Sequence, residues 1–179
     1  MSREPGTVRV EVVHRPHRTL RRILALAVAI GTMASASVLA QEGETTPLHG
    51  DDVITIESAH GFEETTARLE DAIAAEGLML VMTIDHAANA ANVGMELPPT
   101  TLFVFGSPEA GTPLMQAART VALDLPQKML VWQDDAGVVF VSWRDPGALA
   151  ADHGLATDHG PLPNIARNLE ALARAAAAS

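Results

Sequence analysis

Residues 97–115 constrain the fold of this chain more than any other stretch, because they join two prolines, an apolar run and a dense turn. The consecutive prolines cannot continue a helix, so the chain has to extend into residues 100–105, which we interpret as a central buried strand. Turn-forming residues at 106–113 follow, and within them Thr112-Pro113 has the form of an N-cap and a first helical position. The stretch therefore predicts a rigid approach, a buried strand, a tight turn and the start of a helix.

The N-terminus has the three parts of a secretory signal peptide. Six arginines within residues 1–22 precede an apolar run at 23–30, and small residues follow. With Val38 at the −3 position and Ala40 at the −1 position, the pattern predicts cleavage after Ala40 and a periplasmic or secreted location. The alternative is an uncleaved membrane anchor, since residues 23–40 approach the roughly 20 residues that span a bilayer.

Charge and cysteine content exclude several classes of function. The first 40 residues hold six arginines and two glutamates, a net of +4, so the chain's net charge of −10 leaves −14 for residues 41–179. A nucleic-acid partner requires a basic surface, so we predict none, and we expect no membrane contact once the leader is cleaved. The chain has no cysteine, which excludes disulfides, thiol nucleophiles and thiolate metal sites.

The periodicity of the remaining residues predicts a single domain in which strands and helices are interposed. After a polar tail at 41–51, we expect strands at 53–57, 78–84, 100–105, 128–133 and 138–143, and helices at 61–77, 87–95, from 112, at 145–153 and at 161–178. The strand at 78–84 is a continuous apolar run and has the composition of a buried strand. The turn at 134–137 makes the last two strands an antiparallel hairpin.

This order favours an α+β fold with a mainly antiparallel sheet of about five strands and helices packed on one face. We expect residues 52–156 to form the core domain and residues 157–179 to add a C-terminal amphipathic helix. Packing of that helix over the sheet is one interpretation of its apolar stripe, and dimer formation through the stripe is the other.

Two histidines and two methionines make a first candidate site. His86 follows a predicted strand, His153 ends a predicted helix, and Met95 and Met115 flank the central strand. Imidazole and thioether groups are suitable ligands for copper, especially Cu(I), so these four residues could form a metal site with copper as its cofactor. The alternative is that the methionines fill gaps in the core and each histidine caps an element.

A second candidate site is a ligand pocket beside the turn at 106–113. Gly106, Ser107 and Thr112 lie between a strand and a helix start, where free backbone N–H groups could hold an anion, although no phosphate-loop motif is present. Together with His86 and His153 they form the ligand-binding set that we expect, in a pocket between the His86 strand end and this turn. A purely structural turn is the other interpretation.

A hydrolase is an alternative from a different class of function. Ser107 lacks the Gly-x-Ser-x-Gly elbow of nucleophilic hydrolases, so no catalytic residue is assigned. His86 could still form an acid–base pair with a nearby carboxylate, such as Asp85 or Asp124. A structural domain that forms homo-oligomers is the third interpretation.

Five segments in succession resemble the domain of unknown function 302 family. They lie at residues 83–90, 98–108, 111–115, 124–128 and 143–155. The resemblance covers roughly residues 52–156, with mild departures at Ser107, where the family usually has Asn, and near Trp143, where it usually has Tyr. It implies a compact α+β fold of the β-α-β sandwich type, for which a TATA-binding-protein-like arrangement is one form. It implies no established activity, so the residues lead us to expect an exported module that binds a small ligand or a metal ion.

Overall fold

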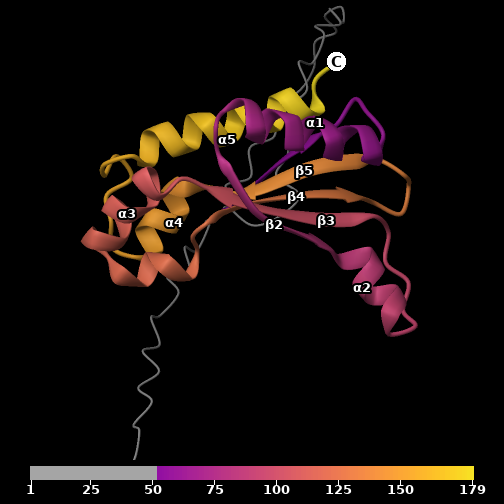
Figure 1. The fold of residues 1–179 in the computed structure, drawn as a ribbon, viewed down its shortest axis with the longest axis horizontal. Coiled ribbons are helices and arrows are strands. Elements are labelled where there is room, and N and C mark those ends of the chain that lie inside the picture. Colours follow the sequence, from indigo (N-terminus) through magenta and orange to yellow (C-terminus); the bar gives the residue numbers. More distant parts are fainter. Residues whose placement is uncertain (1–51) are drawn as a thin grey trace, which may run out of the picture. The chain divides into compact units, whose positions relative to one another are not determined.

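The computed structural model describes residues 52–179, which form a five-stranded sheet with helices around it (Figure 1). The strands are β1 (Val53–Glu57), β2 (Met79–Asp85), β3 (Thr100–Gly106), β4 (Gln127–Gln133) and β5 (Val139–Arg144). The helices are α1 (Phe62–Ala75), α2 (His86–Asn92), α3 (Pro108–Ala117), the 3-10 helix η1 (Arg119–Leu123), α4 (Pro146–Asp152) and α5 (Leu162–Ala177). Within this part of the chain no helix has the length and hydropathy to cross a membrane. The predicted signal peptide, its cleavage after Ala40 and the tail at 41–51 lie outside the described residues.

All four pairs of neighbouring strands are antiparallel, and the sheet order is β1-β5-β4-β3-β2. The prediction of an α+β fold with a mainly antiparallel sheet of five strands is therefore confirmed. The β4–β5 hairpin turns through Gly137, whose φ of +86° is a left-handed conformation that a residue without a Cβ adopts readily. β1 and β2 are the two edges of the sheet.

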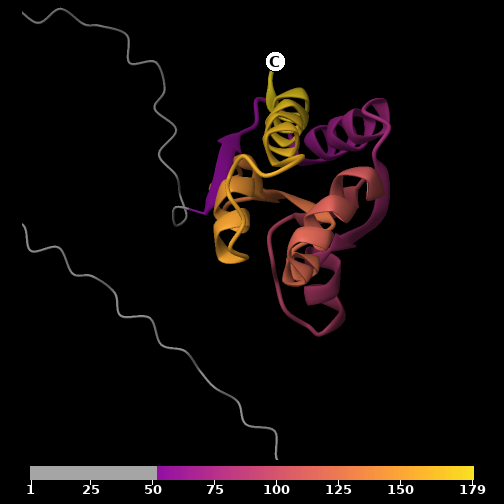
Figure 2. The same cartoon turned by 90° about the vertical axis from the view of Figure 1, so that its left-hand side faces the viewer.

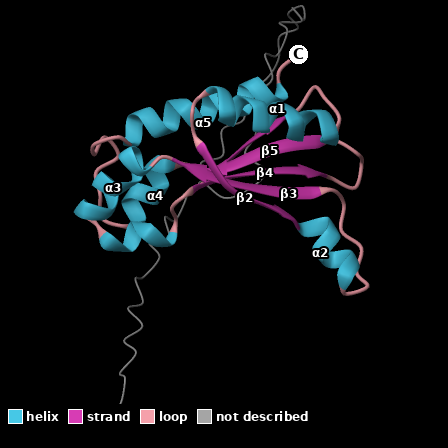
Figure 3. Cartoon of the chain, viewed as in Figure 1, coloured by secondary structure: helices cyan, strands magenta, loops and turns pink. Residues whose placement is uncertain are grey.

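Helices α1 and α5 pack side by side over one face of the sheet (Figures 1 and 3). Side chains on successive strand positions point to opposite faces, so one set of alternate residues on β3, β4 and β5 meets these helices. The large buried side chains in this layer are Leu69, Ile73, Phe103, Phe105, Met129, Val131, Val139, Val141, Trp143, Leu169 and Leu172. None of them is more than 4% exposed, so this layer is the main hydrophobic core.

A second, smaller core lies at one end of the sheet, where α3, η1 and α4 meet the start of α5 (Figure 2). Its buried members are Leu114, Val121, Leu149, Ala150 and Leu162. Ile165 of α5 packs against both cores. Helix α5 therefore connects the two cores of the domain.

The end of α5 is hydrogen-bonded to α1 and to the segment between β1 and α1. Ala59 N–H donates to the Ala177 carbonyl at 2.8 Å, and Arg68 Nη2 donates to the Ala178 carbonyl at 3.0 Å. His60 Nε2 lies 2.8 Å from the Ala178 carbonyl oxygen. These contacts satisfy carbonyl groups that the end of a helix leaves without intrahelical partners.

The helix after the central strand begins earlier than the sequence predicts. Its expected start is Thr112-Pro113, but α3 begins at Pro108, and Ser107 is its N-cap. Pro108 suits the first helical position because its ring fixes φ and no N–H is needed there. Pro113 lies inside the helix, where it removes one hydrogen bond, and α3 ends at Ala117.

The apolar run at 78–84 forms a strand as predicted, but that strand is not buried. β2 is an edge strand, and Met79, Leu80, Val81 and Met82 are each at least 40% exposed. An apolar composition does not identify which element or molecule covers a strand. The prediction that residues 78–84 form a buried strand is therefore corrected.

Candidate functional site

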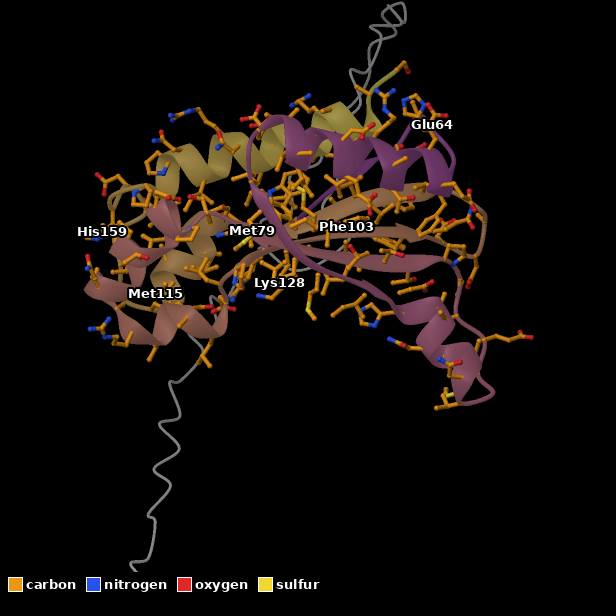
Figure 4. All side chains as sticks on the ribbon, in the orientation of Figure 1. Glu64, Met79, Phe103, Met115, Lys128 and His159 are labelled. Atoms are coloured by element: carbon orange, nitrogen blue, oxygen red, sulfur yellow. The ribbon has the colours of Figure 1, made fainter. Side chains whose placement is uncertain are left out.

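A cavity of about 290 Å³ lies at the Gly106 end of the central strand, between the sheet, α3 and α5. Figure 4 labels two of its wall residues, Met79 of β2 and Met115 of α3. Most of the lining side chains are apolar, and no charged side chain lines the cavity in the described part of the chain. The largest of them are Met79, Phe105, Met115, Leu125, Leu169 and Leu172. Such a wall suits a neutral molecule with a large apolar surface.

Gln127, the first residue of β4, supplies an unusual polar group to this wall. It pairs with Phe105 of β3, and residues directly opposite each other in an antiparallel pair point to the same face of the sheet. Its side chain therefore lies on the face that α5 covers. The Nε2 atom of Gln127 is buried and has no hydrogen-bond partner among the described residues. A buried donor without an acceptor costs about 1–3 kcal/mol, so an acceptor atom on a ligand would be stabilised there.

The turn between β3 and α3 contributes Gly106, Ser107 and Thr112 to the cavity. The Ser107 hydroxyl donates to Glu109 Oε2 at 2.5 Å, and this hydrogen bond lowers the pKa of the Glu109 carboxyl. Glu109 lies in the first turn of α3, where the positive end of a helix would attract an anion. The protein's own carboxylate thus occupies the position that an anion cradle would require.

A wider hollow of about 650 Å³ lies between β1 and α5. Its rim carries charged side chains, among them Glu170 and Arg174, which pair with each other at 2.8 Å. The buried polar atom without a partner among the described residues is Gln127 Nε2, so the cavity at Gln127 is the better candidate for a ligand site.

A polar cluster lies beside the second core and consists of Thr120, Asp124, Arg144, Asp152 and His153. His153 Nε2 is 2.6 Å from Asp124 Oδ2, and His153 Nδ1 is 3.0 Å from Thr120 Oγ1. Arg144 Nη1 donates to Asp124 Oδ1 at 2.8 Å, and Arg144 Nη2 contacts Asp152. We call this group the Asp124 cluster. It connects η1, the end of β5 and α4.

Hydrogen bonding to His153 favours the ionised form of Asp124. The hydrogen bond from His153 holds the pKa of Asp124 below its ordinary value, and attraction to Arg144 adds to this, whereas burial opposes it. Nearby, burial lowers the pKa of Lys128, whose Nζ donates to the Asp124 carbonyl at 2.8 Å. An ionised Asp124 accepts a hydrogen bond from His153 Nε2–H, and in that tautomer Nδ1 accepts a hydrogen bond from the Thr120 hydroxyl. Hydroxyl, imidazole and carboxylate in this order form the arrangement that activates a nucleophile.

The structure brings together only part of the predicted ligand-binding set. Gly106, Ser107 and Thr112 line the cavity, whereas His153 belongs to the Asp124 cluster. His86 begins α2 after the far end of β2.

The register of β2 shows how far His86 is from the turn. Met79 pairs with Gly106, while Asp85, the residue before His86, pairs with Thr101. At about 3.4 Å per residue, the two ends of β2 are roughly 20 Å apart. The expected pocket between the His86 strand end and the 106–113 turn is therefore corrected, since these features lie at opposite ends of the sheet.

The four predicted metal ligands do not meet either. Met115 lines the cavity and His153 contacts Asp124, whereas His86 and Met95 follow the far end of β2. Nor do the described residues include a group of three or more His, Cys, Asp or Glu side chains arranged to hold a metal ion. The expected copper site of His86, Met95, Met115 and His153 is thus not assembled, because α2 and the loop after it carry His86 and Met95 at one end of β2, whereas Met115 on α3 and His153 after α4 lie at the other end of the sheet.

The acid–base pair expected at His86 is also replaced by another one. Asp85 Oδ1 accepts a hydrogen bond from the Ala88 N–H at 2.8 Å and caps α2. Asp124, the other expected carboxylate, bonds to His153 instead. Both expected carboxylates thus have partners other than His86, and Asp124 pairs with His153.

A family model and curated relatives match most of the described residues. The family model described as "Domain of unknown function DUF302" matches residues 54–178. Two curated relatives are named fluoride-specific ion channels, FluC 1 of Brucella suis biovar 1 and FluC 2 of Brucella melitensis biotype 1. Each is 38% identical over 121 residues, which cover 68% of this chain and 48% or 45% of the relative. The chain thus spans about half the length of the curated relatives it matches.

A solved structure has the same fold. The crystal structure of an uncharacterized conserved protein DUF302 from Bacillus stearothermophilus superimposes with a TM-score of 0.62 at 19% identity. The similarity covers 70% of this chain and 98% of the other. At this level of identity it supports the arrangement of strands and helices.

Proposed function

We propose that this chain, which belongs to the DUF302 family of domains of unknown function, is an exported module that binds a small neutral ligand in the cavity at Gln127. One observation carries the proposal, namely a cavity with apolar walls and a single buried amide donor that has no partner among the described residues. Small-molecule sites commonly combine apolar walls with a few placed polar groups. The predicted signal peptide supports the exported location.

The size and polarity of the cavity limit the class of ligand. A cavity of about 150 Å³ holds benzene, so 290 Å³ holds a molecule of roughly a dozen non-hydrogen atoms. Nε2 of Gln127 donates, so the ligand carries an acceptor such as a carbonyl oxygen. A charged ligand would lose its hydration without gaining a counter-ion, because no charged side chain in the described residues lines the cavity.

The names of the channel relatives raise fluoride as a ligand, but the cavity does not favour it. Fluoride is a small, strongly hydrated anion, and apolar walls do not replace its water. Glu109 also places a negative charge at the start of α3. We therefore propose a neutral organic ligand for this domain, also in the longer chains that carry a similar region.

Three molecules of similar size test the proposal. Acetophenone carries a neutral acceptor, ethylbenzene lacks one, and benzoate is charged. Titration of the chain with each, followed by amide chemical shifts in NMR, should give affinities in the order acetophenone, ethylbenzene, benzoate. Gln127→Met should weaken acetophenone binding by about threefold to tenfold and leave ethylbenzene unchanged, because one neutral hydrogen bond is lost.

The control is Gln133→Met, on the same strand and outside the cavity, which should not alter the order. Absence of binding for all three molecules would overturn the proposal. A preference for benzoate would do the same, since it would require a cation at the site. Sodium fluoride in the same titration tests the channel-derived alternative directly.

A hydrolase is a second candidate function, and the Asp124 cluster favours it. In such a reaction the Thr120 oxygen would attack an ester carbonyl carbon while His153 Nδ1 takes the hydroxyl proton and returns it to the leaving alcohol. Water would then cleave the acyl–Thr120 ester by the same route. The chain should hydrolyse p-nitrophenyl acetate, and Thr120→Val and His153→Gln should each abolish this rate above background. His86→Gln, the control, should not change it, and equal rates in all four proteins would contradict this function.

A further inference from the structure

Exposed apolar side chains gather at one edge of the sheet and on the segment that follows it. Among the described residues nine large apolar side chains are exposed, and seven of these lie between residues 79 and 97. They are Met79, Leu80, Val81, Met82, Val93, Met95 and Leu97. Single apolar residues scattered over a surface are normal, but a group of this kind marks a surface that another molecule covers. We call residues 79–82 and 93–97 the β2 edge.

The strand at this edge is exposed on both of its faces. Met79 is 56% exposed and Met82 is 50% exposed, and the two residues between them are also at least 40% exposed. Alternate side chains of a strand that packs on one side are buried, and here no member of the run is. α1 and α5 thus leave the side chains at positions 79–82 of β2 about half exposed, although Met79 and Val81 also line the cavity.

The features that usually block pairing at a sheet edge are almost missing from β2. Residues 79–84 include no charged residue and no proline. A bulge interrupts the strand between Leu80 and Met82, so its regular part runs from Met82 to Asp85. The opposite edge, β1, exposes one large apolar residue, Ile54, and ends in Glu57.

We propose that the β2 edge docks a second copy of this chain, with the two β2 strands antiparallel about a two-fold axis. Such a pair is self-complementary, because each strand offers its partner the same row of backbone donors and acceptors in reverse order. An axis through the middle of the strand places Asp85 of one copy opposite the uncharged start of the other strand. The two carboxylates therefore do not meet. Residues 93–97, at the end of α2, flank the paired strands.

Area and charge favour a second copy as the occupant. Seven exposed side chains of this size present several hundred Å² of apolar surface, on the order of the ~800 Å² per partner that a stable complex buries. Homodimer interfaces are more apolar than other protein interfaces, which matches this composition. The strongly acidic domain would repel its own copy through most surfaces, but the strand at this edge is uncharged over residues 79–84.

The proposal predicts a dimer that the substitution of one exposed side chain disrupts. Light scattering on the full chain as it elutes from a size-exclusion column should show a dimer that dissociates on dilution. Met82→Glu should raise the dissociation constant about tenfold or more, since two carboxylates would then lie within the interface. Met82 does not line the ligand cavity, so the effect is separate from the proposed binding function. The matched control is Leu123→Glu, because Leu123 is the most exposed large apolar residue and lies on η1.

Hydrogen exchange gives a second measurement that does not depend on the variant. Amides of residues 79–85 should exchange more slowly at high protein concentration than at low concentration, whereas those of β1 should not change. A monomer at all concentrations would overturn the proposal. If that monomer bound phosphatidylcholine vesicles, a lipid surface and not a second copy would cover the β2 edge. A dimer that Met82→Glu leaves intact, or that Leu123→Glu disrupts equally, would also overturn it.

Discussion

The unpartnered amide of Gln127 is a local source of instability in the free protein. Gln127→Met keeps the length of the side chain and removes the buried donor, so we expect the free energy of unfolding to rise by about 1 kcal/mol. Urea unfolding without added ligand measures this change. Gln133→Met should act in the opposite direction, because Gln133 Nε2 donates to the Gly137 carbonyl at 3.0 Å. A loss of stability in both variants would show that the Gln127 amide has a partner in solution.

The hydrogen bonds at Asp124 make stability depend on pH. The pKa of Asp124 is lower in the folded protein than its ordinary value of 3.8, so its contribution is present above that pH and disappears as the pH falls below it. As the pH falls below 5, Asp124→Asn should therefore lose less stability than the wild-type protein. Near pH 7 the variant should be about 1–2 kcal/mol less stable than the wild-type protein. Thermal unfolding across this pH range measures the difference. Parallel curves for the two proteins would contradict the assignment.

Individual residues show how far the sequence alone can lead. Gln127 could have been found, since it occupies a core-facing position of β4 in register with the buried Met129 and Val131. The pairing of His153 with Asp124 could not, because 29 residues separate them and only the packing of η1 against α4 brings them together. His86 and His153 looked equivalent as element-terminal histidines, although they end elements at opposite ends of the sheet.

At the scale of an element, Gly111 lies inside α3 and also lines the cavity. A Cβ on Gly111 would lie 3.6 Å from Leu125 Cδ1 and 3.8 Å from Met115 Cε, which are ordinary contacts. Gly111→Ala should raise stability by about 0.5–1 kcal/mol, because alanine is the better helix former. It should also weaken acetophenone binding, since the methyl group enters the cavity. Gly77→Ala is the comparison, and its φ of +67° predicts a loss of stability instead.

The elements were predictable to the degree that periodicity determines them. The five strands and the two long helices follow from apolar spacing, and the β4–β5 hairpin follows from its turn. The sequence predicts the start of α3 too late, because Ser107-Pro108 and Thr112-Pro113 have the same capping pattern. The residues around the two pairs do not show which pair begins the helix. The exposure of β2 was missed because an apolar run has the same sequence whether its own domain covers it or another molecule does.

At the scale of the whole molecule, the net charge of −14 over residues 41–179 predicts an effect of salt on stability. Repulsion between like charges favours the expanded chain, and salt screens it over a Debye length that falls from about 30 Å at 0.01 M to about 10 Å at 0.1 M. The melting temperature should therefore rise by a few degrees over this range in calorimetry. A fall would show that ion pairs such as Arg144–Asp124 contribute more than the repulsion.

The contacts between the two ends of the described chain determine when this domain can finish folding. β1 pairs with β5 about 90 positions later, and Arg68 and Ala59 bind the last residues of α5. Such long-range contacts form late, so the sheet cannot close before β5 has been synthesised, nor the helical layer before α5 has been. A nascent chain with this topology stays unfolded until the end of α5 emerges. That delay is compatible with the export that we propose, because a polypeptide that crosses a translocon does so before it folds.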